Sequence, residues 1–392
     1  MNRSIDRFLT THAGSLPRPQ YLLDINLAKE RGQAYNEDVY AKDLKQAVAD
    51  IVKRQREIGI DIVDDGEFGK SSFITYVNER LSGIERKDEG VRRNPWKHSR
   101  EYEAFPEFYE WAEKLAGSGG STGRVHMVCT GPIAYKGQAQ LKSDLDNLKA
   151  ALNGTPSENA FIPAISPTNV EGWQKNEYYK TDDEYLAAIA DAMHEEYKAI
   201  TDAGFLVQID DPRLATYYVL NPQLSLQQCR AWAEKRVEAL NHALRGIPPE
   251  RVRYHTCYSI NMGPRVHDMN LKDIVDVMLK INAGAYSFEA ANPRHEHEFT
   301  VWEDVALPEG KAIIPGVITH TSNLVEHPEL VAQRIARFAK IVGPENVIAG
   351  SDCGFSTFST SLEVHPSVVW AKLEALTEGA RLASKQFWNG RS

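Results

Sequence analysis

Eight short runs of apolar and β-branched residues recur along this chain, with helical stretches between them. This alternation is typical of a parallel sheet whose strands are joined by crossover helices. A bare (β/α)8 barrel needs ~250 residues, so a chain of 392 residues can hold one with long insertions. We therefore predict an α/β protein, a single (β/α)8 TIM barrel domain over residues 1–392. Its strands are expected within residues 8–15, 60–67, 124–131, 205–210, 251–257, 285–289, 312–318 and 346–353.

Helices between these runs follow from apolar spacing and end signals. Apolar residues at helical spacing predict a helix over residues 37–58 that stops at Gly59, and a second helix is expected to begin after an N-cap at Thr181 and to run to about Ala203. Residues 270–280 and 328–342 are expected to be helical in the same way.

Two segments are interpreted as insertions into the barrel. Residues 86–115 are rich in charged and aromatic side chains and include Pro95 and Pro106. Residues 153–179 contain a further apolar run at 161–165, which we interpret as part of a loop or lid and not as a barrel strand. Insertions of this kind often shape the pocket at the rim of a barrel.

Four potential metal ligands lie at the ends of three predicted strands: His255, Cys257, Glu289 and Cys353. Two thiolates, an imidazole and a carboxylate suit Zn²⁺. In a His-x-Cys strand both side chains point to one face, and the C-terminal rim of a barrel would bring the other two ligands near. Structural zinc sites use local cysteine knuckles, unlike this spacing. The spacing is equally compatible with two buried cysteines, a core histidine and a salt-bridged glutamate.

Composition excludes several classes of partner. A formal net charge of -9, with basic residues scattered among acids, offers no basic surface for nucleic acid. There is no apolar run long enough for a membrane span and no apolar core of a signal peptide near Met1, so a cytoplasmic protein is expected. Four cysteines are too few for a disulfide framework, and Cys129 and Cys229 are interpreted as buried structural thiols.

The ordered motifs resemble the catalytic barrel of the cobalamin-independent methionine synthase family over nearly the whole chain. Tyr-His-Thr-Cys-Tyr (254–258), Phe-Glu-Ala (288–290) and Ser-Asp-Cys-Gly (351–354) are similar to that family's three zinc-ligand motifs. The resemblance implies zinc as cofactor, held by His255, Cys257, Glu289 and Cys353, and an acceptor thiol whose sulfur binds the metal. Coordination makes a thiol with a pKa of about 8.5 a thiolate nucleophile.

Three further motifs suggest where the substrate lies. Residues 10–17 are similar to the family's Gly-Ser-Phe-Pro strand end, which implies that Gly14 and Ser15 hold a substrate carboxylate. By the same resemblance, Glu67 in Asp-Gly-Glu (65–67) and Asp210 in Gln-Ile-Asp-Asp-Pro (208–212) would meet the polar end of the thiol. Arg18 could pair with a carboxylate or sulfonate, or be a surface arginine in a Pro-flanked loop.

Two departures from the family concern the alkyl donor and the proton. Residues 130–138 carry Gln138 where the family has a tryptophan associated with the pterin, which leaves open whether the donor is a folate, a simple methyl compound or an epoxide. In residues 316–322, Thr321 occupies the position of the family's proposed general acid and His320 stands one residue earlier. His320 is our candidate catalytic residue, although a one-residue shift turns a strand side chain to the other face.

The polar run at residues 292–298 follows the Glu289 strand and is expected on the rim. Its His-x-His pattern, His295 and His297, is interpreted as a solvated loop and not as a second metal site. Arg294 in the same run is a candidate anion contact.

The leading hypothesis is a zinc-dependent enzyme that moves a methyl or other alkyl group onto a small thiol, with homocysteine the first candidate acceptor. Short relatives of the family include epoxyalkane:coenzyme M transferases, so alkylation of coenzyme M is the alternative. A metal-independent lyase on the same barrel and a zinc-stabilised binding protein are the other hypotheses.

Overall fold

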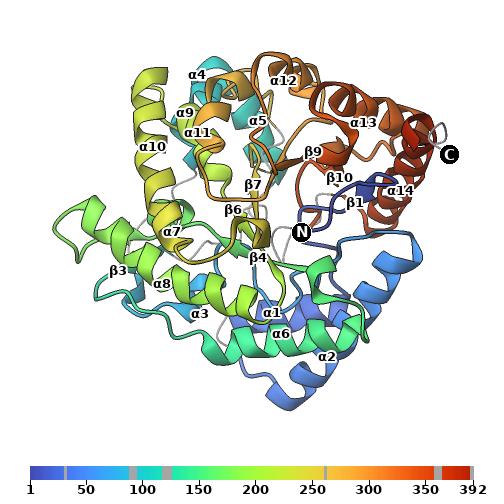
Figure 1. Ribbon diagram of the computed structural model, residues 1–392. Coiled ribbons are helices and arrows are strands. Elements are labelled where there is room, and N and C mark those ends of the chain that lie inside the picture. Colours follow the sequence, from blue (N-terminus) through green and yellow to red (C-terminus); the bar gives the residue numbers. More distant parts are fainter. Residues whose placement is uncertain (31–32, 88–94, 117–125, 260–262, 357–363, 389–392) are drawn as a thin grey trace.

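A curled parallel sheet lies at the centre of the protein, with helices around it (Figure 1). The computed structural model describes residues 1–30, 33–87, 95–116, 126–259, 263–356 and 364–388. Within them the strand order is β1-β10-β9-β8-β7-β6-β4, and each neighbouring pair is parallel. These strands are β1 (Leu9–Thr10), β4 (Phe161–Ile165), β6 (Leu206–Asp210), β7 (Val252–Thr256), β8 (Ala285–Phe288), β9 (Ala312–Ile318) and β10 (Ile348–Ser351).

Residues 61–63 close the sheet between its two edge strands. The backbone amide of Asp61 donates to the Thr10 carbonyl of β1, and Val63 exchanges backbone hydrogen bonds with Asn159 and Phe161 at the start of β4. The segment predicted as the strand at 60–67 thus occupies the eighth position of the ring, although its hydrogen bonding is irregular. The predicted (β/α)8 barrel is confirmed.

Two of the apolar runs exchange roles relative to the prediction. Residues 161–165, interpreted from sequence as part of a lid, form the fully buried strand β4, which pairs with β6 over all five residues. The run at 124–131 contributes β3 (His126–Cys129) to a separate sheet with β2 (Ile84–Lys87) and β5 (Lys175–Asn176). Both interpretations were wrong, because two short apolar runs look alike until their non-local hydrogen-bond partners are known.

The helices surround the barrel. Predicted helices at 37–58, 181–203 and 328–342 correspond to α2 (Glu37–Glu57), α8 (Asp182–Asp202) and α13 (Pro328–Val342), and Thr181 caps α8 by accepting from the Glu184 amide. Residues 270–280 form only a 3₁₀ turn, Leu271–Asp273, and the four-residue α11. The α-helices are α1 (Gln20–Glu30), α2 (Glu37–Glu57), α3 (Val77–Arg80), α4 (Arg100–Ala104), α5 (Pro106–Ala116), α6 (Gln138–Leu152), α7 (Pro167–Trp173), α8 (Asp182–Asp202), α9 (Pro212–Leu220), α10 (Leu226–Ala243), α11 (Val275–Met278), α12 (Val301–Asp304), α13 (Pro328–Val342) and α14 (Pro366–Trp388).

The barrel interior changes from apolar to polar along the strands. One apolar layer lies near the strand beginnings and forms a cluster of its own, separate from the core between sheet and helices. Further along, the positions that share its face by alternation are polar, including Gln208 and Asp210 of β6 and His255 of β7. Polar side chains therefore collect at the C-terminal ends of the strands, where barrel enzymes place their sites. The apolar layer comprises Ile62, Phe161, Leu206, Ala285, Ala312, Ile314 and Ile348.

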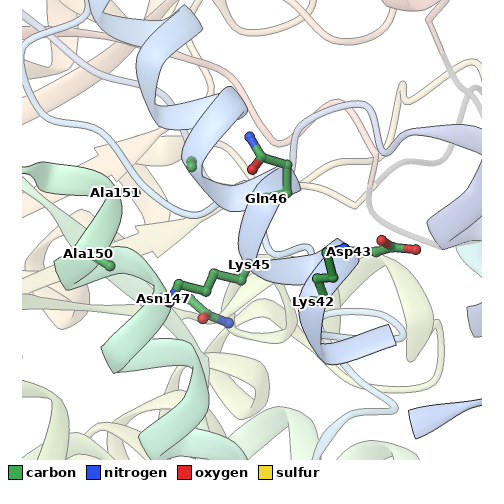
Figure 2. Close-up of a pocket in the computed structure, with 8 residues that line it drawn as sticks. Lys42, Asp43, Lys45, Gln46, Asn147, Ala150 and Ala151 are labelled. Atoms are coloured by element: carbon green, nitrogen blue, oxygen red, sulfur yellow. The ribbon is translucent and has the colours of Figure 1, made fainter. Parts of the chain in front are cut away.

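A hollow of about 360 Å³ lies between α2 and α6, and polar side chains such as Lys45 and Asn147 line most of it (Figure 2). None of the predicted site residues lines it. No helix in the part of the chain that the structure describes is long and apolar enough to cross a membrane.

A glycine in β9 permits the close approach of β10. A Cβ atom at Gly316 would lie 2.7 Å from both the Cα and the backbone N of Asp352, so the strands would have to separate. We expect Gly316→Ala to lower the free energy of unfolding by about 2–3 kcal/mol, the upper range for overpacking a core. Gly131→Ala is the control, because its Cβ would meet nothing nearer than 3.5 Å. Urea denaturation of both variants checks this, and equal stability would contradict it.

Candidate metal centre and acceptor pocket

Three of the four predicted metal ligands converge at the C-terminal end of the barrel. His255 lies in β7, Cys257 directly follows that strand, and Cys353 follows β10. One donor atom from each lies within 4.8 Å of the other two, and the two Sγ atoms are 3.5 Å apart. All three side chains are buried. Since β8 and β9 separate these strands in the sheet, the curvature of the barrel creates this donor group of His255, Cys257 and Cys353.

The donor group has the chemistry of a zinc site. His255 Nδ1 is hydrogen-bonded to Ser287 Oγ at 3.0 Å, while the buried Nε2 has no partner among the described residues. Burial lowers the pKa of His255 to about 3, so the ring is neutral, as a ligand must be. The hydrogen bond with Cys257 and burial raise the pKa of Cys353. Two adjacent buried thiolates would therefore need a cation to offset their negative charge. Two sulfurs and one imidazole nitrogen suit Zn²⁺.

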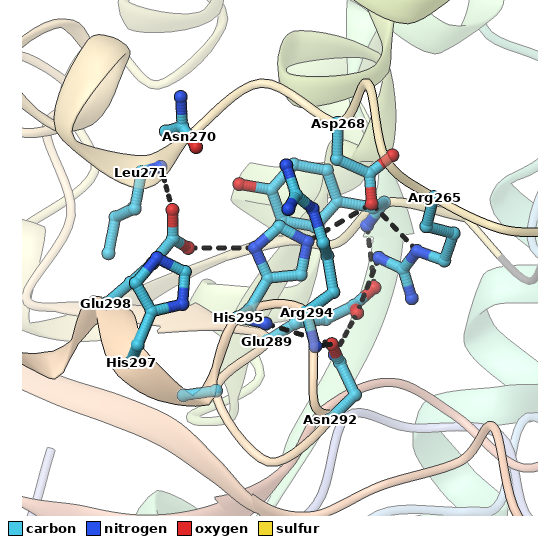
Figure 3. Close-up of polar contacts among 12 residues, drawn as sticks. Arg265, Asp268, Asn270, Leu271, Glu289, Asn292, Arg294, His295, His297 and Glu298 are labelled. Carbon is cyan, nitrogen blue, oxygen red and sulfur yellow. Dashed lines mark hydrogen bonds and ion pairs between the residues drawn. The ribbon is translucent and has the colours of Figure 1, made fainter. Parts of the chain in front are cut away.

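Glu289 stands outside this donor group, and other partners hold its carboxylate. Oε1 accepts from the Tyr258 backbone amide at 2.7 Å. Oε2 accepts from Arg265 Nη2 and from Asn292 Nδ2, both at 2.8 Å (Figure 3). The structure therefore brings together three of the four predicted ligands and gives the fourth a buried salt bridge.

A buried ion network extends from Glu289 along the two rim loops (Figure 3). Arg265 also donates through Nε to Asp268, which contacts His295 Nε2, and His295 Nδ1 contacts Glu298. Burial alone would lower the pKa of His295, but these two carboxylates raise it to about 9. The imidazolium is thus part of the network. His297 is exposed, so the His-x-His pair does not converge on a common point.

A second acidic cluster lies beside the donor group. Asp210 pairs in register with His255, and Gln208 Nε2 donates both to Asp210 and to the Ala13 carbonyl. Burial and the neighbouring Glu67 raise the pKa of Asp210 well above its usual range. Glu67 Oε2 is buried and has no hydrogen-bond partner within the described residues. Ionisation of one of these two close carboxyl groups disfavours ionisation of the other, and a bound cationic group would favour the charged form of both.

The backbone around Glu67 is shaped to bring it to the first strand. Glu67 has a positive φ of 59°, an uncommon conformation for a residue with a side chain. A Cβ atom at Gly14 would lie 2.7 Å from Glu67 Oε1, so only glycine permits this approach. The acidic cluster of Glu67 and Asp210 therefore lies against the predicted substrate-binding end of β1.

Ser15 and Arg18 support this corner of the site. Arg18 is 4% exposed, so the alternative that it is a surface arginine is wrong. Its Nη1 donates to the carbonyl of Ser356, and its Nη2 donates to the carbonyl of Glu67. Ser15 Oγ accepts from the Ser356 amide, three residues after Cys353. Both residues thereby fasten the turn that carries Cys353.

His320 follows β9 and is fully buried. Neither ring nitrogen has a side-chain or backbone hydrogen bond of good geometry among the described residues. Burial lowers its pKa to about 4, although the nearby Asp352 opposes this. Asp352 itself accepts from the backbone amides of Ala290 and Ala291, which ties the end of β10 to the segment after Glu289.

Several functional neighbours were not found from the sequence. Ser287 precedes Glu289 by two residues and pairs in register with His255, so strand alternation could have identified it. Asp211 is not one of them, because it accepts from the Leu214 amide at the start of α9 and serves as the N-cap of that helix. Arg265 comes from a loop, and nothing local in the sequence indicates its partner.

Comparisons with known proteins agree with this architecture. The family model described as "Cobalamin-independent synthase, Catalytic domain" matches residues 8–100 and 168–371. The chain is similar to methionine synthases of Thermococcus kodakarensis, 22% identical over 96% of this chain and 94% of the relative, and of Sulfolobus acidocaldarius, 24% identical over 90% and 87%.

Two solved structures share the fold. A B12-independent methionine synthase from a Shewanella species, in complex with selenomethionine, superposes with a TM-score of 0.74 at 19% identity, over 98% of this chain and 99% of the other. A putative vitamin-B12 independent methionine synthase from Listeria monocytogenes gives a TM-score of 0.64 at 20% identity, over 96% and 98%. At these identities the likeness concerns the barrel itself.

Proposed function

The chain belongs to the cobalamin-independent synthase catalytic domain family, and from this membership we propose that it transfers a methyl group to the sulfur of homocysteine at a zinc site. The observation that carries the proposal is the donor group of His255, Cys257 and Cys353 beside a pair of buried carboxyl groups. The methionine synthases to which the chain is similar over most of its length support the same reaction.

The acidic cluster favours homocysteine over coenzyme M as acceptor. Homocysteine carries an ammonium group, which Glu67 and Asp210 would pair with by charge-assisted hydrogen bonds. Coenzyme M carries a sulfonate and no ammonium group, so it would offer this pair of buried carboxyl groups no positive charge. Arg18, the sequence-based candidate for an anion contact, already donates to the carbonyls of Ser356 and Glu67.

In the proposed reaction the chain binds, orients and shields the acceptor. When bound, the metal would lower the pKa of the acceptor thiol and so supply a thiolate near neutral pH. Ser287 would hold the ring of His255 through Nδ1 and leave Nε2 as the nitrogen available to the metal. Glu67 and Asp210 would fix the amino group and align the sulfur with the methyl carbon of the donor.

His320 is proposed to contact the leaving group. With a pKa of about 4 its ring is neutral near pH 7, so it would stabilise the leaving group by donating a hydrogen bond from its single N–H. Its burial at the end of β9 would keep bulk water from the reacting atoms. Glu289 is proposed as the fourth metal ligand, competing with the acceptor for the remaining coordination position.

Zinc content and zinc-edge X-ray absorption of the purified protein test the proposal. We expect about one zinc per chain, and homocysteine should add a third sulfur neighbour at about 2.3 Å. Coenzyme M at the same concentration should leave the spectrum unchanged. Purified protein without zinc, or zinc whose ligands do not change when homocysteine is added, would contradict the proposal. A third sulfur neighbour that appears only with coenzyme M would identify coenzyme M as the acceptor.

A further inference from the structure

A fully buried arginine crosses the interior of the barrel near the donor group. Arg253 lies in β7 two residues before His255, so both side chains point into the barrel. Its Nη1 donates to Thr11 Oγ1 at 2.9 Å, and its Nη2 donates to the His12 carbonyl at 2.8 Å. In the closed ring, β7 lies opposite β1, with β10, β9 and β8 between them on one side and β6, β4 and residues 61–63 on the other. Arg253 therefore joins two opposite walls of the barrel.

Filling space does not explain an arginine at this position. Arg253 pairs in register with Ala285 of β8, which belongs to the apolar layer of the interior. Its partners are two uncharged oxygen atoms and the ring of Phe161, whose centre lies 3.9 Å from the guanidinium. Burying a charge among such partners costs stability, whereas an apolar side chain would continue the layer. The arginine thus points to a role other than packing.

The segment that this arginine reaches, residues 11–15, is here called the polar-end segment, because the proposed function assigns it to the polar end of the acceptor. Gly14 in this segment is a predicted holder of the substrate carboxylate. Gln208 Nε2 donates to the segment through the Ala13 carbonyl at 2.6 Å, and it also donates to Asp210 at 2.8 Å. The groups that would hold the carboxylate and the amino group of the acceptor are therefore linked to each other.

The polar-end segment is also fastened on its other side, to the turn after β10. The amide of Phe355, two residues after Cys353, donates to the Ser15 carbonyl at 2.8 Å. This contact fixes the segment relative to Cys353, whereas the hydrogen bonds of Arg253 fix it relative to β7, the strand that leads to the rest of the donor group. Together the two contacts set the distance between the polar-end segment and the donor group.

We propose that Arg253 is a positioning residue that sets this distance and thereby selects the acceptor by the length of its carbon chain. This inference rests on the proposed function. Homocysteine has two methylene groups between its α carbon and its sulfur, and cysteine has one. With their polar ends held alike, the two sulfur atoms would lie about 1 Å apart along the pocket, and a misplacement of that size can cost about a hundredfold in rate.

Dissociation constants of homocysteine and cysteine, measured by isothermal titration of the zinc-loaded protein, test this role. We expect wild type to prefer homocysteine by roughly 10- to 200-fold, the range for one methylene group. In Arg253→Met this ratio should fall by about tenfold, the lower end of that range, because the polar-end segment can then shift toward the donor group. A general loss of stability would weaken both thiols alike and leave the ratio unchanged. Arg253→Lys should behave as Arg253→Met, since an ammonium group lacks the planar fork that reaches both acceptor atoms.

Two substitutions of Thr11 test the same contact from the opposite wall and leave the arginine in place. Thr11→Val removes the acceptor of Nη1 and leaves the hydrogen bond from Nη2 to the His12 carbonyl. The preference for homocysteine should therefore fall by about threefold, as expected for the loss of one hydrogen bond. Thr11→Ser keeps the hydroxyl group and should keep the wild-type preference. This pair decides the question even where the Arg253 variants fold poorly.

Arg334→Met is the matched control for loss of a buried arginine. Arg334 lies in α13, and its Nη1 donates to the Val317 carbonyl of β9 from the helical side of the sheet. This variant should lose stability and keep the wild-type preference. An unchanged preference in Thr11→Val, an equal fall in Arg334→Met, or a wild type that binds both thiols equally would overturn the role of Arg253 while leaving the proposed function intact. Wild-type protein that binds no zinc, or no homocysteine, would overturn the proposed function instead.

Discussion

Cys353→Ser is expected to abolish productive zinc binding and turnover. Cys353 supplies one of the two sulfurs of the donor group, and its Sγ lies 3.5 Å from that of Cys257. Zinc affinity should fall more than ~100-fold, since even changes to outer-shell partners cost 10–100-fold. We expect kcat/KM for homocysteine to fall roughly 10³-fold or more, because both thiolate formation and alignment of the sulfur are lost. Metal analysis and initial rates check this.

Cys229→Ser separates the effect of the metal site from the general effect of losing a buried thiol. Cys229 is 1% exposed and lies in α10, on the outside of the barrel. This variant should keep its zinc and its rate, with at most a modest loss of stability. A Cys353→Ser protein that retains zinc at the wild-type level, or a Cys229→Ser protein that loses it, would contradict the assignment of the donor group.

Asp210→Asn is expected to weaken homocysteine binding through the amino group alone. Loss of a hydrogen bond to a charged group costs about 1.5–3 kcal/mol, which corresponds to a roughly 10- to 150-fold rise in Kd. The des-amino analogue 4-mercaptobutanoate has no ammonium group to lose. We therefore expect its Kd to change less than about threefold on the same substitution. Isothermal titration of the two ligands against wild type and variant measures both effects.

The adjacent residue supplies the control for this prediction. Asp211 caps α9 and its carboxylate also accepts from Asn169. Asp211→Asn should therefore lower the free energy of unfolding by about 1 kcal/mol, as for loss of a cap, with unchanged discrimination between the two ligands. If Asp210→Asn weakened homocysteine and its des-amino analogue equally, Asp210 would not be the partner of the amino group.

The ligand positions on the strands were open to prediction because strand geometry is local. His255 and Cys257 are two residues apart, so alternation places them on one face wherever the strand lies. The C-terminal end of a parallel barrel then gathers the ends of distant strands, which is why Cys353 from β10 could be expected beside them. The Asp210–Asp211 pair follows the same rule, with one carboxyl group toward the barrel interior and the other capping α9.

Partners that come from loops were not open to prediction in this way. Loops carry no fixed period, so nothing near Arg265 in the sequence indicates that it meets Glu289. For Arg18 the sequence left open a contact to a substrate anion or a place on the surface, and the residue is in fact buried between Glu67 and the Cys353 turn. Such contacts depend on the path of two separate segments.

By itself, therefore, the amino-acid sequence determined that the chain forms a parallel barrel and which side chains face its C-terminal end, because apolar alternation acts over a few neighbouring residues. Only the tertiary structure decided that residues 161–165 and not 124–131 complete the barrel, since the choice rests on hydrogen bonds from β4 to β6 and to residue 63. It also decided that Glu289 rests on Arg265 outside the donor group. That outcome depends on electrostatic competition between groups 24 residues apart along the chain, which no local pattern encodes.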